Sequence, residues 1–257
     1  MTQKEKAETF RSLHVKGSPV ILFNIWDAGS ARTIEQAGAK AIATGSWSVA
    51  AVYGFEDGEK IPLELVLANI KRIVESVALP VTLDFETGYA TDLSALKENI
   101  RNVIDAGAIG INFEDRIIGA EGLQTIEDQS ARIKAVREAA DEASIPLFIN
   151  ARTDVFLKTY PAKHDEGQLD EALRRAAAYA EAGASGLFAP GLRQPELIEK
   201  LCERSPLPVN ILMLPDTPST QTLAQLGVAR ISYGAAPYRQ MSEALKQAAQ
   251  KAFANVS

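Results

Sequence analysis

The sequence predicts a (β/α)8 TIM barrel, and the main evidence is a phrase that recurs along the chain. EQAGAKAIATGS (35–46), DAGAIGINFEDR (105–116) and EAGASGLFAPGL (181–192) each combine a helix end, Ala-Gly-Ala and a short apolar strand. QLGVARISYGA (225–235) is a looser fourth copy. Glycine accepts the left-handed backbone that stops a helix. The first three copies begin 70 and 76 residues apart, which corresponds to two β-loop-α units of roughly 35 residues each.

The rest of the chain alternates between predicted strands and amphipathic helices. Eight strands alternating with eight helices, without a Pro- or Ser-rich linker, indicate a closed barrel in one domain over residues 1–257. An open doubly wound sheet would also alternate, but eight regular units favour closure. We expect strands near 19–27, 41–46, 80–86, 109–115, 146–152, 186–191, 208–214 and 230–235. We expect helices near 30–38, 62–77, 92–107, 128–143, 167–183, 194–205, 219–227 and 237–254, with an extra N-terminal helix near 3–14.

Composition narrows the class of protein. Of the 257 residues, 46% are hydrophobic and 23% are charged, which is typical of a globular chain with its own core. The net charge of −6, with no Lys/Arg block, argues against nucleic-acid and anionic-membrane partners. The single Cys202 excludes an intrachain disulfide, and the first ten residues, MTQKEKAETF, contain no apolar signal core. We therefore expect a soluble cytoplasmic protein.

Polar residues gather where three neighbouring strands are expected to end, which in such a barrel is the catalytic face. In VTLDFETGYA (81–90), Asp84 and Glu86 stand two residues apart and would share one face of a strand. Unpaired buried carboxylates are expensive, so they need a partner. The next two strands contribute the same-face pairs Asn112/Glu114 and Asn150/Arg152.

Oxygen ligands of this kind suit Mg²⁺ or Mn²⁺. Asp84, Glu86 and Glu114 are the candidate metal ligands, whereas His14 and His164 lie on the leading helix and in a loop and form no zinc cluster. The alternative is that the acids cap helices or pair with Arg152. For Asp27 and Asp115 that structural role is as well supported as a functional one.

LDFETGYA, INFEDR and INARTD, in that order at those strand ends, resemble the isocitrate lyase/phosphoenolpyruvate mutase superfamily. In that family the first motif usually reads Asp-x-Asp-x-Gly-Tyr-Gly, so Glu86 and Ala90 depart from it. The resemblance implies that Asp84 is the metal-side carboxylate, with Glu86 and Glu114 acting directly or through metal-bound water. It also implies a substrate-binding Arg152.

Two further segments match the family. The resemblance implies that backbone N–H groups and a hydroxyl of one turn hold the substrate carboxylate; that turn is Thr44, Gly45, Ser46 and Trp47. It also places Asp57, in YGFEDGEK, on a loop that points toward the site. We take Arg152, Asp57 and Glu114 as the catalytic candidates.

The loop after the fourth predicted strand departs from the family. The lyase branch has Lys-Lys-Cys-Gly-His there, with the Cys as proton donor, but this chain has RIIGAEGLQT (116–125). Cys202 lies on a predicted helix far from the barrel mouth, the face at which the strands end, and is expected to pack in the core. Cleavage of isocitrate or 2-methylisocitrate is therefore disfavoured. The Lys/Asn pattern of the phosphonopyruvate branch is also absent, and Phe188 to Gly191 stand where other branches have His or Glu.

The resemblance implies a Mg²⁺-dependent enzyme that cleaves or rearranges a C–C or P–C bond next to the carboxylate of a small 2-oxo or phosphono acid, through an enolate or related oxyanion. Two alternatives stay open: a decarboxylase or hydrolase of oxaloacetate-like diacids, and a catalytically silent metabolite-binding barrel. The family also implies a homo-oligomer, a tetramer or dimer. In it the last helix is commonly exchanged between subunits, and the sequence does not distinguish exchange from packing on its own barrel.

Overall fold

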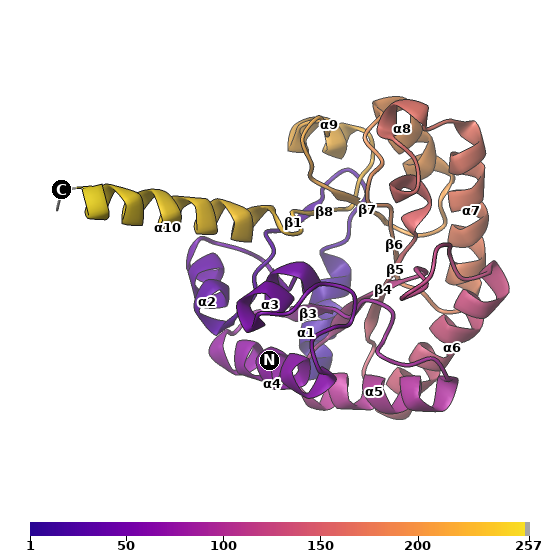
Figure 1. Ribbon diagram of the computed structural model, residues 1–257. Coiled ribbons are helices and arrows are strands. Elements are labelled where there is room, and N and C mark those ends of the chain that lie inside the picture. The colour runs from indigo at the N-terminus through magenta and orange to yellow at the C-terminus, as the bar shows by residue number, and fades with distance from the viewer. Residues whose placement is uncertain (255–257) are drawn as a thin grey trace.

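The computed structural model describes residues 1–254 and shows a parallel barrel seen along its axis in Figure 1. Within the described residues the sheet has the order β1-β8-β7-β6-β5-β4-β3-β2. A parallel bridge between Ile25 and Thr44 joins the two outer strands and closes the ring. The predicted (β/α)8 barrel is confirmed. The strands are β1 (Val20–Leu22), β2 (Ile42–Ala43), β3 (Val81–Asp84), β4 (Gly110–Glu114), β5 (Phe148–Arg152), β6 (Gly186–Phe188), β7 (Val209–Leu212) and β8 (Arg230–Ser232).

Helices surround the strands, and nine of those described lie close to the ranges expected from the sequence. They are α1 (Gln3–Ser12), α2 (Ala28–Gln36), α4 (Leu63–Ser76), α5 (Leu93–Asp105), α6 (Ile126–Glu142), α7 (Glu166–Glu181), α8 (Pro195–Arg204), α9 (Thr220–Gln225) and α10 (Ala236–Ala254). Several helices have an N-cap residue whose side-chain oxygen accepts a hydrogen bond from the first turn, for example Asp92 before α5 and Thr125 before α6. The buried, free Cys202 lies on α8, as expected.

The structure adds elements that the sequence analysis did not predict. Helix α3 (Ser46–Tyr53) begins immediately after β2, with Gly45 at its N-cap, so the expected turn at residues 44–47 is the start of a helix. Its sequence, SWSVAAVY, has no capping side chain and no clear polar face, which is why the helix was missed. Two short 3-10 helices, η1 (Asp154–Leu157) and η2 (Pro161–Lys163), follow β5.

Each Ala-Gly-Ala phrase forms the helix end that the sequence predicts. Gly38, Gly107 and Gly183 have φ of 94°, 94° and 101°, which is the left-handed region. The alanine before each glycine is the C-cap of its helix, and the chain then turns into the next strand. The recurrence in the sequence therefore reflects the same helix stop at three places.

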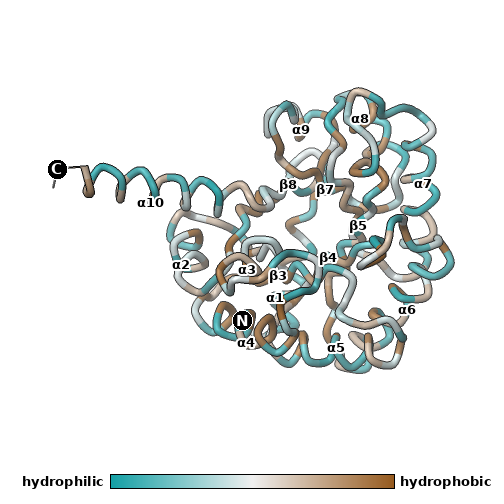
Figure 2. Tube along the Cα trace, in the orientation of Figure 1, coloured by the Kyte–Doolittle hydropathy of each residue, from teal (hydrophilic) through white to brown (hydrophobic). Residues whose placement is uncertain are grey.

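Apolar side chains fill the layer between the strands and the surrounding helices. Figure 2 shows hydrophobic positions along the strands and on inward helical turns, with hydrophilic positions on the outer turns. A second cluster closes the N-terminal end of the barrel, where Phe10 of α1 meets Phe148 with ring centroids 5.3 Å apart. The opposite end, where the strands end in polar residues, stays open as the mouth.

Helix α10 leaves the barrel and extends away from it (Figure 1). Among its described residues only Pro237 is buried, whereas Leu245 and Phe253 are 67% and 73% exposed. The helix therefore does not pack along its own barrel. None of the helices between residues 1 and 254 has the length and apolar character needed to cross a membrane.

The repeated helix stop yields a matched pair of variants. At both Gly107 and Gly38, φ is 94°, but an added Cβ meets Val74 Cγ1 at 2.7 Å only at Gly107, and nothing within 4 Å at Gly38. Gly38→Ala should cost about 1–2 kcal/mol of unfolding free energy from backbone strain alone. Gly107→Ala should cost about 1–3 kcal/mol more because of overpacking. Urea denaturation measures both, and equal losses would contradict the packing argument.

Candidate active site

The register of three adjacent strands brings the predicted side chains together at the mouth. Asp84 of β3 pairs with Asn112 of β4, which pairs with Asn150 of β5, and one step further along Glu114 pairs with Arg152. These residues therefore form two successive rows. Glu86 is different, because β3 ends at Asp84 and Glu86 has a left-handed φ of 49°. The prediction that Asp84 and Glu86 share a strand face is wrong for this reason.

Asp84 is held from both sides. Its Oδ2 accepts a hydrogen bond from the Ser46 N–H at 3.0 Å, and its Oδ1 accepts one from Asn112 Nδ2 at 3.3 Å. Its own N–H donates to Thr44 Oγ1 at 2.9 Å. Ser46 is the first residue of α3, where free N–H groups and the helix dipole favour an anion. In this structure Thr44 and Ser46 thus position Asp84, although they were expected to bind substrate.

Arg152 lies between two carboxylates. Its Nη1 is 2.6 Å from Glu114 Oε2, and its Nε and Nη2 donate to the two oxygens of Asp154 at 2.6 and 3.0 Å. Burial opposes the positive charge of Arg152, but the carboxylates of Glu114 and Asp154 raise its pKa overall. Burial raises the pKa of Glu114 to about 7, against the opposing effect of Arg152. Nε and Nη2 each donate to Asp154 and Nη1 is ion-paired with Glu114, so the guanidinium is held in one orientation.

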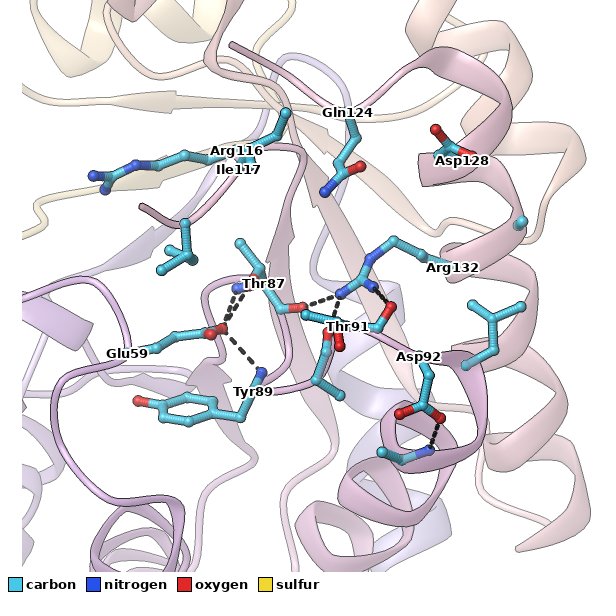
Figure 3. Close-up of a pocket in the computed structure, with 15 residues that line it drawn as sticks. Glu59, Thr87, Tyr89, Thr91, Asp92, Arg116, Ile117, Gln124, Asp128 and Arg132 are labelled. Carbon is cyan, nitrogen blue, oxygen red and sulfur yellow. Dashed lines mark hydrogen bonds between the residues drawn. The ribbon is translucent and has the colours of Figure 1, made fainter. Parts of the chain in front are cut away.

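Glu86, after β3, and Glu59, on the loop between α3 and α4, are joined by reciprocal hydrogen bonds, and we call this pair of contacts the latch. The sequence analysis did not predict a role for Glu59. Both oxygens of Glu86 accept from the Glu59 N–H, at 3.1 and 3.0 Å. In return, Glu59 Oε1 accepts from the N–H groups of Thr87 and Tyr89 at 3.0 and 2.9 Å, as Figure 3 shows. Glu86 is 4% exposed, and burial followed by the charges of Asp57 and Asp84 raises its pKa to about 8.

Asp57 lies two residues before Glu59, on the same latched loop between α3 and α4. Partial desolvation and the negative charge of Asp84 raise its pKa, while Arg152 acts in the opposite direction. Asp57 is also the strongest charged influence on Glu86. These mutual effects place Asp57 beside the mouth.

The three candidate metal ligands do not converge on one point. Glu86 is engaged by the Glu59 backbone and Glu114 by Arg152, and residues 1–254 contain no cluster of three His, Cys, Asp or Glu side chains at metal-binding distance. Asp84 lies between them at the mouth. The described residues therefore do not bring the three acids together as one preformed set of ligands.

Asp27 and Asp115, for which the sequence left a structural and a functional role open, both have structural roles. Asp27 is the N-cap of α2 and accepts from the Ser30 N–H at 2.7 Å. Asp115 is fully buried and accepts from Arg175 Nη1 at 3.0 Å and Tyr179 OH at 2.9 Å. It also accepts from the Asp154 N–H at 3.0 Å, and so it fixes the residue that holds Arg152.

Trp47 faces the last helix. The Arg239 guanidinium lies 4.7 Å from the centroid of its ring, and Tyr238 contacts both Trp47 and Trp26 edge to face, with centroids 5.9 and 5.0 Å apart. The two tryptophans therefore hold the first turn of α10 against the barrel. A contact between Trp47 and substrate stays a prediction.

Two cavities adjoin the mouth on either side of the loop that follows β4. One, of about 850 Å³, is lined by Glu59, Thr87, Tyr89 and Arg132 (Figure 3). The other, of about 570 Å³, is lined by Arg152, Lys158 and Asp154, among others. Arg116 lines both, and its positive charge lowers the pKa of Glu114. The loop therefore adds a cation to the mouth and, as expected, no thiol.

Comparison with known proteins identifies a family over almost the whole chain. The family model described as phosphoenolpyruvate phosphomutase matches residues 10–253. This chain is a member of that family. A crystal structure of a candidate phosphonomutase from Burkholderia cenocepacia J2315 has 50% sequence identity and a TM-score of 0.95, covering 97% of this chain and 99% of that one.

Relatives of known activity differ in their reactions. The 2-methylisocitrate lyase of Escherichia coli K12 is 29% identical over 254 residues, covering 95% of this chain and 83% of the relative. The oxaloacetate decarboxylase of Pseudomonas entomophila is 27% identical over 241 residues, covering 89% and 78%. Members of the phosphoenolpyruvate phosphomutase family are lyases and mutases, and this chain is an enzyme of that family. The resemblance noted from the three motifs is confirmed.

The raised pKa of Glu86 predicts how stability depends on pH. The folded state binds the Glu86 proton up to about pH 8, whereas the unfolded state loses it near the ordinary value of 4.5. Stability should therefore fall as pH rises through this window, by at most about 1.4 kcal/mol per pH unit. Glu86→Gln removes the cost of ionising this buried carboxylate. The melting temperature of the variant minus that of wild type, both measured in EDTA, should therefore increase between pH 5 and pH 8.5.

The exposed Glu98→Gln on α5 is the control and should show no such trend. A Glu86→Gln variant that gains nothing on wild type as the pH rises would show that the carboxylate is not destabilised by its surroundings.

Proposed function

We propose that this protein is a Mg²⁺-dependent enzyme that breaks or rearranges a C–C or P–C bond next to the carboxylate of a small 2-oxo or phosphono acid. The observation that carries this proposal is the grouping of Asp84 with the ion pair of Glu114 and Arg152 at the carboxyl ends of the adjacent strands β3, β4 and β5. The family membership gives the reaction class.

The residues at the mouth fit a divalent cation. Carboxylates outnumber cations there, and the pKa of both Glu86 and Glu114 is raised by burial and by neighbouring acids. A bound cation relieves that excess of negative charge. Asp84 would hold the ion directly, with Glu86 and Glu114 acting through water. The chemistry that such an ion supplies is Lewis-acid stabilisation of negative charge on oxygen.

The protein side chains have separable tasks in this proposal. Arg152 is a fixed donor for substrate oxygens, since its contacts with Glu114 and Asp154 prevent the guanidinium from rotating. Glu114, with a pKa of about 7, is suited to exchange a proton near neutral pH, and Asp57, whose pKa is raised by burial, is a second candidate for proton exchange. Backbone N–H groups near Gly45 and Ser46 would dock the substrate carboxylate, which requires Asp84 to release the Ser46 N–H.

The cavity of about 570 Å³ favours a substrate with a second anionic group. Arg116, Arg152 and Lys158 line it, and of these Arg116 and Lys158 make no ion pair with another described residue. A carboxylate or phosphonate at the far end of the substrate would lie among these cations. Because the loop contains no thiol, cleavage of isocitrate or 2-methylisocitrate is not proposed.

A decarboxylase or hydrolase of oxaloacetate-like diacids is the second candidate. The relative from Pseudomonas entomophila is named oxaloacetate decarboxylase, and such a reaction needs only a metal and Arg152 to stabilise developing negative charge. A catalytically silent barrel is less consistent with the complete set of Asp84, Glu114 and Arg152.

We also propose that the protein is a homo-oligomer, a dimer or tetramer, in which α10 packs on a neighbouring subunit. The support is the exposure of Leu245 and Phe253 on a helix that its own barrel does not cover.

Metal removal tests the proposed reaction class. Oxaloacetate, phosphonopyruvate and phosphoenolpyruvate should be offered with Mg²⁺ and followed by NMR, with isocitrate and 2-methylisocitrate as substrates that should stay intact. EDTA and Asp84→Ala should each abolish turnover, because Asp84 is the direct ligand. Cys202→Ser, buried on α8 away from the mouth, should stay fully active. Full turnover after exhaustive EDTA treatment would refute the metal requirement.

Arg152→Lys separates catalysis from structure. Lysine keeps the charge but loses the planar fork. If Arg152 stabilises developing charge, kcat should fall roughly a hundred- to a thousandfold, equivalent to about 2.7–4 kcal/mol, and KM should rise. A variant with wild-type kcat and a lowered melting temperature would instead show that Arg152 only neutralises Glu114 and Asp154.

A further inference from the structure

Arg230 is a buried positive charge without a carboxylate partner. It begins β8, its side chain lies in the barrel interior, and only 1% of the residue is exposed. Among residues 1–254 no acidic side chain forms an ion pair with it. Buried charges normally have a partner of opposite sign, so this arginine needs an explanation.

The contacts of Arg230 point toward the mouth. Its Nη2 donates to Asn112 Oδ1 at 3.0 Å, and its Nε donates to Ser232 Oγ at 3.4 Å. On its other side the guanidinium lies 6.0 Å from the centroid of the Phe10 ring. Phe10 belongs to the apolar cluster that closes the N-terminal end of the barrel, called the plug below. Arg230 is therefore placed directly below the polar row that ends in Asp84.

This arrangement fixes the direction of the Asn112 amide. Asn112 Oδ1 accepts from Arg230 Nη2 and from Asn150 Nδ2, the latter at 2.9 Å. Arginine can only donate, so the oxygen must face it, and the amide nitrogen must face Asp84 Oδ1 at 3.3 Å. A flipped amide would place its NH₂ against the guanidinium and its oxygen against the carboxylate, and both contacts are repulsive.

The Arg230 guanidinium keeps its positive charge, and His14, below it in the plug, stays neutral. Burial lowers the pKa of Arg230 to about 9, against the opposing charge of Asp84, so the guanidinium stays protonated at neutral pH. Below it, burial and the charge of Arg230 lower the pKa of His14 to about 3. His14 is therefore neutral and adds no second cation to the plug.

We propose that Arg230 is a positioning residue for the metal site: it locks the Asn112 amide so that its N–H holds the Asp84 carboxylate in the direction needed to bind a divalent cation. This inference rests on the proposed function, because it assumes that Asp84 is the metal ligand. It assigns a role to a buried residue that lies below the polar row and need not touch the substrate.

The test is Mn²⁺ affinity of the purified full chain, measured by electron paramagnetic resonance without substrate. Arg230→Met keeps an unbranched side chain and removes every donor, so Mn²⁺ should bind at least about tenfold more weakly. If only the charge mattered, removing a cation would strengthen Mn²⁺ binding. Unchanged or tighter binding would therefore overturn the proposal. Arg230→Gln serves if the methionine variant does not fold, and the same weakening is expected because glutamine both donates and accepts.

Arg137→Met is the matched control. Arg137 is half-buried, and its hydrogen bonds, like those of Arg230, go to neutral acceptors, the carbonyls of Leu147 and Gly183 and the Ser185 hydroxyl. It should lose stability and keep wild-type Mn²⁺ affinity.

A double-mutant cycle tests the route. In an Asn112→Leu background, Arg230→Met should have no further effect on Mn²⁺ affinity, since the amide through which it acts is gone. A persistent effect would show that Arg230 acts on the site in another way and would refute the proposal. Wild-type protein that binds no Mn²⁺ would contradict the proposed function itself and the inference with it, whereas wild-type binding with unaffected variants contradicts the inference alone.

Discussion

The excess of carboxylates at one end of the barrel is the constraint on which the site depends. Asp84, Glu86 and Glu114 come from neighbouring strand ends, and the latched loop adds Asp57. Carboxylates that are close together and buried repel one another when ionised. Burial and this repulsion raise the pKa values of Glu86 and Glu114. A barrel keeps such a cluster only where its stable core offsets the cost and a ligand of opposite charge uses it.

The protein resolves this repulsion differently for each acid. Asp84 receives N–H donors from the start of α3 and from Asn112, while Glu114 receives the charge of Arg152. Glu86 accepts from the Glu59 N–H and from the Tyr89 hydroxyl, the latter at 3.3 Å, but forms no ion pair with another described residue, and burial and neighbouring acids raise its pKa to about 8. The strongest positive groups are thus placed at the acids nearest the proposed chemistry.

The barrel and most of the site could be predicted because both follow from local pattern. Ala-Gly-Ala requires a left-handed glycine wherever it occurs, and acids at the ends of parallel strands must meet at one mouth. The role of Glu59 could not be predicted, since it depends on left-handed turns at Glu59 and Glu86 that neither residue type favours. Arg230 was missed because an arginine at the start of a strand usually reaches solvent, and only closure of the ring buries it.

The departure from the family motif at position 86 has a structural consequence. Glutamate is one methylene longer than the aspartate usual in the family, and in this structure its carboxylate extends to the N–H of Glu59. The same contact ties the loop that contains Asp57 to the loop after β3, and Glu59 reinforces it through the N–H groups of Thr87 and Tyr89. The glutamate at position 86 therefore fixes the position of a second loop. Glu86 and Glu59, two acids that need not touch the substrate, therefore tie the loop that contains Asp57 to the end of β3, where Asp84 lies.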